Sequence, residues 1–73
     1  MVELYTLPNC PHCDAARDDL EWRGVPFVEH DVEGDPEARE RMLRITGGTR
    51  TVPVIVEEGT PPQVGWMGGG CSI

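Results

Sequence analysis

The stretch VELYTLPNCPHCDAARDDLEWRG, residues 2–24, decides the fold because a strand, a short turn and a helix follow one another in it. Residues 2–6 alternate closely enough to predict a short strand. The helix is predicted to begin at Pro11, because proline fits the first helical turn, and to end near Gly24, a typical C-terminal cap. The turn between strand and helix therefore presents two cysteines where the helix starts.

A second strand and helix follow the first pair. Valine-rich residues 25–32 predict the strand, and the helix is predicted between the capping residue Asp35 and the glycine at Gly47. A third strand is predicted over residues 51–58 and a fourth over residues 63–67, with a tight connection between them. Strand-helix-strand units favour parallel pairs, whereas the short final connection favours an antiparallel hairpin. The predicted fold class is α/β, a mixed four-stranded sheet with helices packed on it.

The composition indicates a single small acidic domain over residues 1–73, because 38% hydrophobic content in this length leaves a thin core. Such a core supplies about 3–5 kcal/mol. Six arginines, no lysine and thirteen acidic residues give a net charge of −7, which repels nucleic acids and anionic membranes. No apolar run is long enough to span a bilayer, and no signal segment is recognisable. We therefore expect a monomeric, cytoplasmic protein that binds neither nucleic acid nor membranes.

The motif CPHC places one cysteine at the start of the helix and a second one turn further on. Unpaired amides and the positive dipole end of the helix stabilise a thiolate at Cys10, which is the candidate nucleophile. Cys13 is near enough to attack a mixed disulfide on Cys10 and is the candidate resolving thiol. Pro11 and His12 are candidate tuning residues, since a ring that favours the thiolate makes the pair more oxidising.

Three segments, YTLPNCPHC, TRTVPVIV and GGGCSI, in this order and at these separations, resemble the glutaredoxin family within the thioredoxin fold. The resemblance covers nearly the whole chain. It implies a thioredoxin-like fold, here with a C-terminal helix that is short or absent, and a thiol-disulfide oxidoreductase that reduces or exchanges protein or glutathione mixed disulfides. It implies no bound cofactor, with glutathione as a co-substrate. The histidine of CPHC replaces the tyrosine usual in dithiol glutaredoxins and is similar to the motif of periplasmic disulfide oxidases.

The resemblance also implies a binding groove beside the two cysteines. The family places a cis-proline there, so the bond between Val52 and Pro53 is expected to be cis. Thr51, Val52 and Pro53 then become candidates for binding an extended peptide or glutathione as a short added strand. Arg50 is the candidate cation for a glutathione carboxylate.

The glycine-rich segment near residue 70 resembles the part of the family that holds the γ-glutamyl end of glutathione, which implies Gly70, Cys71 and Ser72 as further binding residues. Ser72 stands where an aspartate is common, and Leu7 stands where a lysine is common. Cys71 has two other interpretations, as an apolar residue that fills or lines the groove and as a third redox thiol.

Other functions remain open at this point. A thioredoxin-like electron donor of the ribonucleotide-reductase redoxin type would use the same groove, take electrons from thioredoxin reductase and depend little on glutathione. A non-catalytic adaptor would use the fold as a binding surface and make little use of the two cysteines. An iron–sulfur module would share a cluster with glutathione. A zinc site would combine Cys10, Cys13 and Cys71 with one of the histidines, His12 or His30. Neither histidine nor Cys71 has the spacing of a second ligand pair, so no metal is expected. Trp22 and Trp66 are predicted to lie at the edge of the core.

Overall fold

The computed structural model describes residues 1–73 and contains two helices and six short strands. In chain order, the elements are β1 (Val2–Thr6), α1 (Pro11–Trp22), β2 (Phe27–Asp31), α2 (Pro36–Thr46), β3 (Thr51–Val52), β4 (Val54–Val56), β5 (Gln63–Val64) and β6 (Cys71–Ser72). Neither helix is long and apolar enough to cross a membrane.

Four strands form the central sheet, in the order β2-β1-β4-β5. β1 and β2 are parallel, as the strand-helix-strand pattern predicts, whereas β4 runs antiparallel to both β1 and β5. The remaining two strands, β3 and β6, form a separate antiparallel pair. The prediction of a mixed four-stranded sheet is therefore confirmed.

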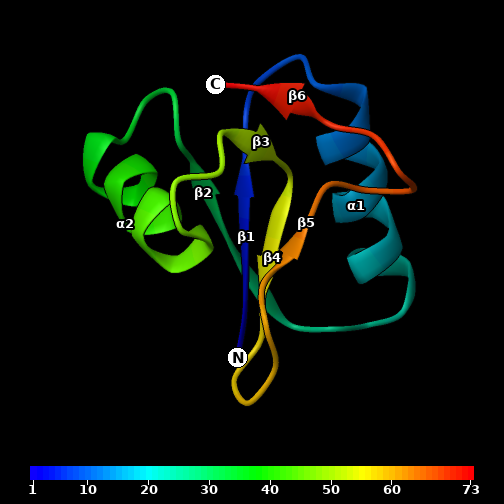
Figure 1. Ribbon diagram of the computed structural model, residues 1–73. Coiled ribbons are helices and arrows are strands. Elements are labelled where there is room, and N and C mark those ends of the chain that lie inside the picture. The colour runs from blue at the N-terminus through cyan, green and yellow to red at the C-terminus, as the bar shows by residue number, and fades with distance from the viewer.

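The two helices cover opposite faces of the sheet (Figure 1). Neighbouring residues of β1 point to opposite faces, as in any strand, and so contribute to two different cores. Leu4 packs with Ala16 and Leu20 of α1, while Tyr5 packs with Met42 of α2. Because α1 is held against one face, its first turn is fixed beside the C-terminal end of β1.

The helix ends follow from local sequence chemistry. The Asp35 carboxylate accepts hydrogen bonds from the amides of Glu37 and Ala38, which satisfies unpaired donors in the first turn of α2. That helix ends at Gly47, whose φ of 74° lies in the left-handed region that glycine adopts without a penalty. α1 begins at Pro11, as predicted.

Strand boundaries differ from the prediction in three places. The Val52–Pro53 peptide bond is cis, as expected, and it divides the predicted third strand into β3 and β4. The fourth strand is limited to Gln63–Val64, because the chain turns at Gly65, which has a φ of 83°. The additional strand β6 lies beside β3 at the end of the sheet where α1 begins (Figure 1).

The two tryptophans differ in environment. Trp66 packs partly buried against the core under α1, as predicted. The prediction for Trp22 was wrong, because its side chain is 89% exposed. The buried stripe of α1 runs through Cys13, Ala16 and Leu20, and Trp22 lies about half a turn away from that stripe.

Candidate active site

Cys10 occupies the position immediately before the first turn of α1. Its backbone is extended, with a φ of −104°, and its carbonyl accepts the hydrogen bond from the amide of Asp14 that opens the helix. The residue is only 1% exposed and belongs to the buried cluster that also contains Tyr5, Val52 and Met42. The sulfur thus lies at the positive end of the helix, as the sequence predicts for a nucleophile.

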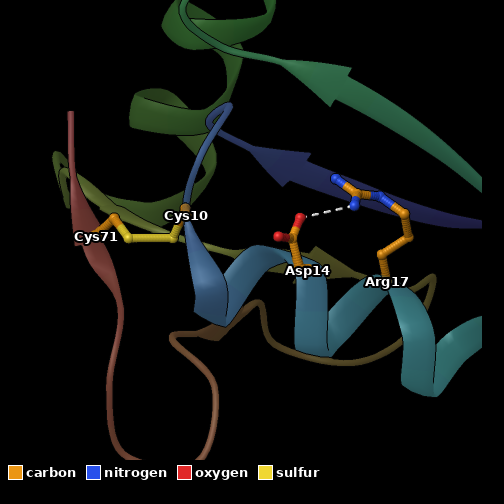
Figure 2. Close-up of a disulfide and its surroundings, with 4 residues drawn as sticks. All are labelled: Cys10, Asp14, Arg17 and Cys71. Carbon is orange, nitrogen blue, oxygen red and sulfur yellow. Dashed lines mark hydrogen bonds and ion pairs between the residues drawn. A yellow bond between two sulfur atoms is a disulfide. The ribbon is translucent and has the colours of Figure 1, made fainter.

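Cys10 is bonded to Cys71 of β6 in this structure, with the Cα atoms 6.2 Å apart (Figure 2). That separation lies within the usual range for disulfides. β6 brings Cys71 there by pairing with β3, so that Cys71 lies opposite Val52 and Ser72 lies opposite Thr51. Cys71 also packs partly buried against the core cluster, so the disulfide adds a bond to Cys10 to that packing, and the role of Cys71 as a redox thiol stays a prediction.

Cys13, the candidate resolving thiol, is free and completely buried, with no exposed surface. Burial raises the pKa of its thiol, and a hydrogen bond with the backbone of Leu7 offsets this effect only in part. A buried, protonated thiol reacts slowly, because the thiolate is the attacking species. Cys10 and Cys13 are therefore close in sequence but differ in state: Cys10 is bonded to Cys71, whereas Cys13 is a free, buried thiol.

His12 lies against the segment that leads into β6. A Cβ atom added at Gly69 would lie 2.5 Å from Cε1 of the His12 ring, so a larger residue at position 69 would require the ring to move. The ring is half-buried by that contact and does not simply face solvent. The tuning roles of Pro11, which is exposed, and of His12 stay predictions.

The predicted binding residues converge on the pair of strands β3 and β6. Val52 and Pro53 are fully buried, and the carbonyl of Arg50 accepts a hydrogen bond from the amide of Ile73 at 2.8 Å. The edge of β3 that was predicted to bind a peptide or glutathione is thus occupied by the chain's own β6. Gly70 is the last residue before β6.

A pocket of about 490 Å³ opens beside this strand pair. Its lining residues are Leu7, Val32, Glu33, Pro36, Arg39, Ser72 and Ile73. Ser72, a predicted binding residue, thus lies in one pocket with Leu7, which stands where the family often has a lysine, whereas Arg50 does not line the pocket. The cation in the pocket is Arg39, which sequence reasoning missed because nothing in the pattern of α2 distinguishes it from the two other arginines of that helix, Arg41 and Arg44.

Charged side chains hold α1 against the edge strand β2. Arg17 donates hydrogen bonds of 2.6 and 2.7 Å to Glu29 of β2 and one of 2.9 Å to Asp14, the last of which Figure 2 shows. The hydrogen bonds from Arg17 lower the pKa of Glu29, which also accepts a hydrogen bond from Thr6. This network fixes the helix that begins directly after Cys10 and carries Cys13 in its first turn.

The cysteines and histidines do not assemble a metal site. No group of three or more histidine, cysteine, aspartate or glutamate side chains is placed to hold an ion. His30 stacks on Tyr5 with the ring centres 4.8 Å apart, and its Nε2 atom lies 3.0 Å from a carboxylate oxygen of Glu3. Its surroundings are therefore those of a packed residue at the sheet.

Comparison with known proteins adds to this geometry. The family model for glutaredoxin matches residues 2–64. The chain belongs to the glutaredoxin family. A probable glutaredoxin of Synechocystis sp., slr1562, is 46% identical over 54 residues, which cover 74% of this chain and 50% of that protein. The glutaredoxin of Pseudomonas aeruginosa is 36% identical over 74 residues, which cover 96% of this chain and 75% of that protein.

Solved structures agree with the family assignment and establish the thioredoxin-like fold. The thioredoxin-like protein BC3987 superposes with a TM-score of 0.83 at 31% identity, covering 92% of this chain and 89% of that one. The glutaredoxin-like NrdH-redoxin of Escherichia coli, described as having a thioredoxin-like activity profile, gives 0.78 at 29% identity, covering 89% and 82%. The chain spans only part of the length of some of these relatives: the match covers 50% of the Synechocystis protein and 64% of glutaredoxin 3 of Escherichia coli.

Proposed function

We propose that this glutaredoxin is a thiol-disulfide oxidoreductase that uses Cys10 to reduce or exchange disulfides of proteins or of glutathione. The observation that carries the proposal is the disulfide between Cys10, at the start of α1, and a second cysteine of the same chain. A sulfur that forms a disulfide at this position can also form a mixed disulfide with a substrate. The helix amides stabilise the Cys10 thiolate that is regenerated when the mixed disulfide breaks. The second thiol of the cycle is Cys13 or Cys71.

The proposed substrate site is the groove around β3. Thr51, Val52 and Pro53 provide the backbone edge, while Gly70 and Ser72 lie across from them. No bound cofactor is needed, because glutathione or a reductase supplies electrons as a co-substrate. We place the protein in the cytoplasm as a monomer that acts on disulfide-containing proteins.

Glutathione is the electron source that the pocket supports. Its carboxylates need a cation, and Arg39 supplies one in the same pocket as Leu7 and Ser72. The apolar side chain at Leu7 supports a second candidate, a redoxin that takes electrons from thioredoxin reductase. The similarity to the NrdH-redoxin structure also favours that second candidate.

Two assays of the purified protein separate the candidates. In the first, a mixed disulfide of glutathione and β-mercaptoethanol is reduced with glutathione, glutathione reductase and NADPH. In the second, thioredoxin reductase and NADPH are supplied instead, with a protein disulfide as the acceptor. Turnover in the first assay alone supports a glutathione-dependent enzyme, and turnover in the second alone supports the redoxin. Absence of turnover in both would overturn the proposed function and favour the adaptor.

Replacing Arg39 by methionine should raise the KM for the glutathione mixed disulfide about three- to tenfold, because a partly exposed charge-assisted contact is lost. Turnover with thioredoxin reductase should change less. Arg44→Met is the matched control, since Arg44 lies on the same helix and does not line this pocket. Equal KM values for both variants would show that Arg39 does not bind glutathione.

Replacing His12 by alanine should lower the reduction potential of the active-site disulfide by about 30 mV, the equivalent of about 1.4 kcal/mol in this two-electron couple. The expected reason is that an imidazole ring two residues after Cys10, at the start of the same helix, favours the Cys10 thiolate and so stabilises the reduced form. Equilibration with glutathione redox buffers, followed by acid quenching and mass spectrometry, measures the potential. A potential equal to that of the parent would remove His12 from the tuning residues.

A further inference from the structure

The two thiols that could resolve a mixed disulfide on Cys10 differ in access. Cys13 is enclosed in the core with no exposed surface, whereas Cys71 is only partly buried and is carried by a two-residue strand at the surface. An attacking thiolate has to reach the Cys10 sulfur while the substrate is still attached to it. Cys71 lies on a strand that is separate from α1, whereas Cys13 belongs to α1 and to the buried core, so exposing the Cys13 sulfur would require the helix to move.

Pairing of β6 with β3 sets the position of the Cys71 sulfur. In an antiparallel ladder, hydrogen-bonded residue pairs alternate with pairs that are not hydrogen-bonded. The amide of Ile73 donates to the carbonyl of Arg50, so the next hydrogen-bonded pair along the ladder is Val52 with Cys71. Val52 belongs to the same buried cluster as Cys10, and Cys71, opposite Val52, is bonded to Cys10, so this strand pair holds one sulfur beside the other.

From these contacts we infer that Cys71 is the resolving thiol of this protein and that β6 takes the place of the departing substrate on β3. The inference rests on the proposed function of Cys10. In the first step, the Cys10 thiolate attacks a substrate disulfide, forms a mixed disulfide and releases one substrate thiolate. In the second, the Cys71 thiolate attacks the Cys10 sulfur, the mixed disulfide breaks, and the second substrate thiolate leaves and takes up a proton. The substrate gains two electrons and the two cysteines lose two.

The same contacts make the oxidised form closed to new substrate. A peptide that adds to β3 as a short strand needs the backbone groups of Val52, and in the disulfide form Cys71 is paired with that residue. Reduction of the Cys10–Cys71 bond frees β6 from its covalent link and makes the edge of β3 available again. Formation of the Cys10–Cys71 disulfide therefore releases one substrate and, in the same step, blocks the binding of the next.

Single-turnover release of a chromophore tests the role of Cys71. The reduced protein is mixed with one equivalent of dithiodipyridine, which releases a first thiopyridone when Cys10 is modified and a second when the mixed disulfide is resolved. In Cys71→Ser, the second release should slow by about tenfold or more, because only the enclosed thiol remains. In Cys13→Ser, the product should still contain the Cys10–Cys71 disulfide, identified by peptide mass mapping after acid quenching.

The outcomes separate this inference from the proposed function. A first release that is absent from the parent would overturn both. A normal first release, with a second release in Cys71→Ser slowed less than about tenfold, would overturn the role of Cys71 alone. The same conclusion would follow from a Cys10–Cys13 disulfide as the main product of the parent.

A second variant tests the strand without touching a thiol. A Cβ atom at Gly70 would lie 2.6 Å from the carbonyl oxygen of Val52 and from Cγ2 of Thr51, so Gly70→Ala should push β6 away from β3. We expect the ratio of the second to the first release rate to fall by about tenfold. Met67→Ala, at an exposed position of the same segment, is the control. A ratio in Gly70→Ala equal to that of the control would overturn the role of β6.

Discussion

Replacing Cys10 by serine should reduce the rate of disulfide exchange by about a thousandfold or more, because a serine hydroxyl neither attacks nor accepts a disulfide under these conditions. The oxygen cannot take the place of a thiolate at the start of α1, even though the helix amides remain. Initial rates of mixed-disulfide reduction and of dithiodipyridine modification, each measured with the parent alongside, give the loss directly.

The comparison has to exclude a loss of fold. Cys10→Ser also removes the disulfide to Cys71, so both proteins are compared in excess reductant, where neither has the bond. Their circular dichroism spectra and melting temperatures should then agree closely. Residual exchange at a tenth of the parent rate or more would identify another thiol as the nucleophile.

Replacing Leu4 by alanine should cost about 3–5 kcal/mol, which is comparable to the whole stability expected of a domain of this size. Leu4 has no exposed surface and lies in the cluster that holds α1 on the sheet. The cavity left by its side chain would weaken the support of Cys10 as well as the fold. Urea denaturation in the presence of reductant should show a largely unfolded population before denaturant is added.

Trp22→Ala is the matched control for this prediction. Trp22 is larger than Leu4 and also apolar, yet its side chain is 89% exposed at the end of α1. Its removal should change the free energy of unfolding by less than about 0.5 kcal/mol. Similar losses in the two variants would mean that the cluster under α1 does not carry the stability assigned to it.

Most of the fold could be predicted because local signals agreed with the tertiary structure. Asp35 and Gly47 mark the ends of α2, and Pro11 marks the start of α1. Trp22 was misplaced because aromatic character was taken as a sign of burial, although the apolar positions of the helix lie on another face. Strand β6 was missed because GGGCSI has neither alternation nor β-branched residues before its last position.

The chemistry of the site could be predicted from the sequence, whereas the contacts between residues far apart in the chain could not. Helix-start placement alone points to Cys10 as the nucleophile. The contact between Cys10 and Cys71 depends on a turn through Gly65 and on pairing of two-residue strands, and neither leaves a periodic signal in the sequence. Arg39 reaches the pocket because α2, which carries it, packs against the face of the sheet that contains Tyr5. Long-range contacts of this kind require coordinates.

The disulfide between Cys10 and Cys71 closes a loop with a sequence separation of 61 residues, which is most of the chain. In the chain-entropy model, a loop of this length restricts the unfolded ensemble by about 4 kcal/mol, close to what the core alone supplies. Each turnover would then alternate the protein between a tightly tethered state and a marginally stable one. Where reductant is scarce, the protein would remain in the more stable disulfide form. Where thiols are plentiful, it would be reduced and active, and at the same time more susceptible to proteolysis.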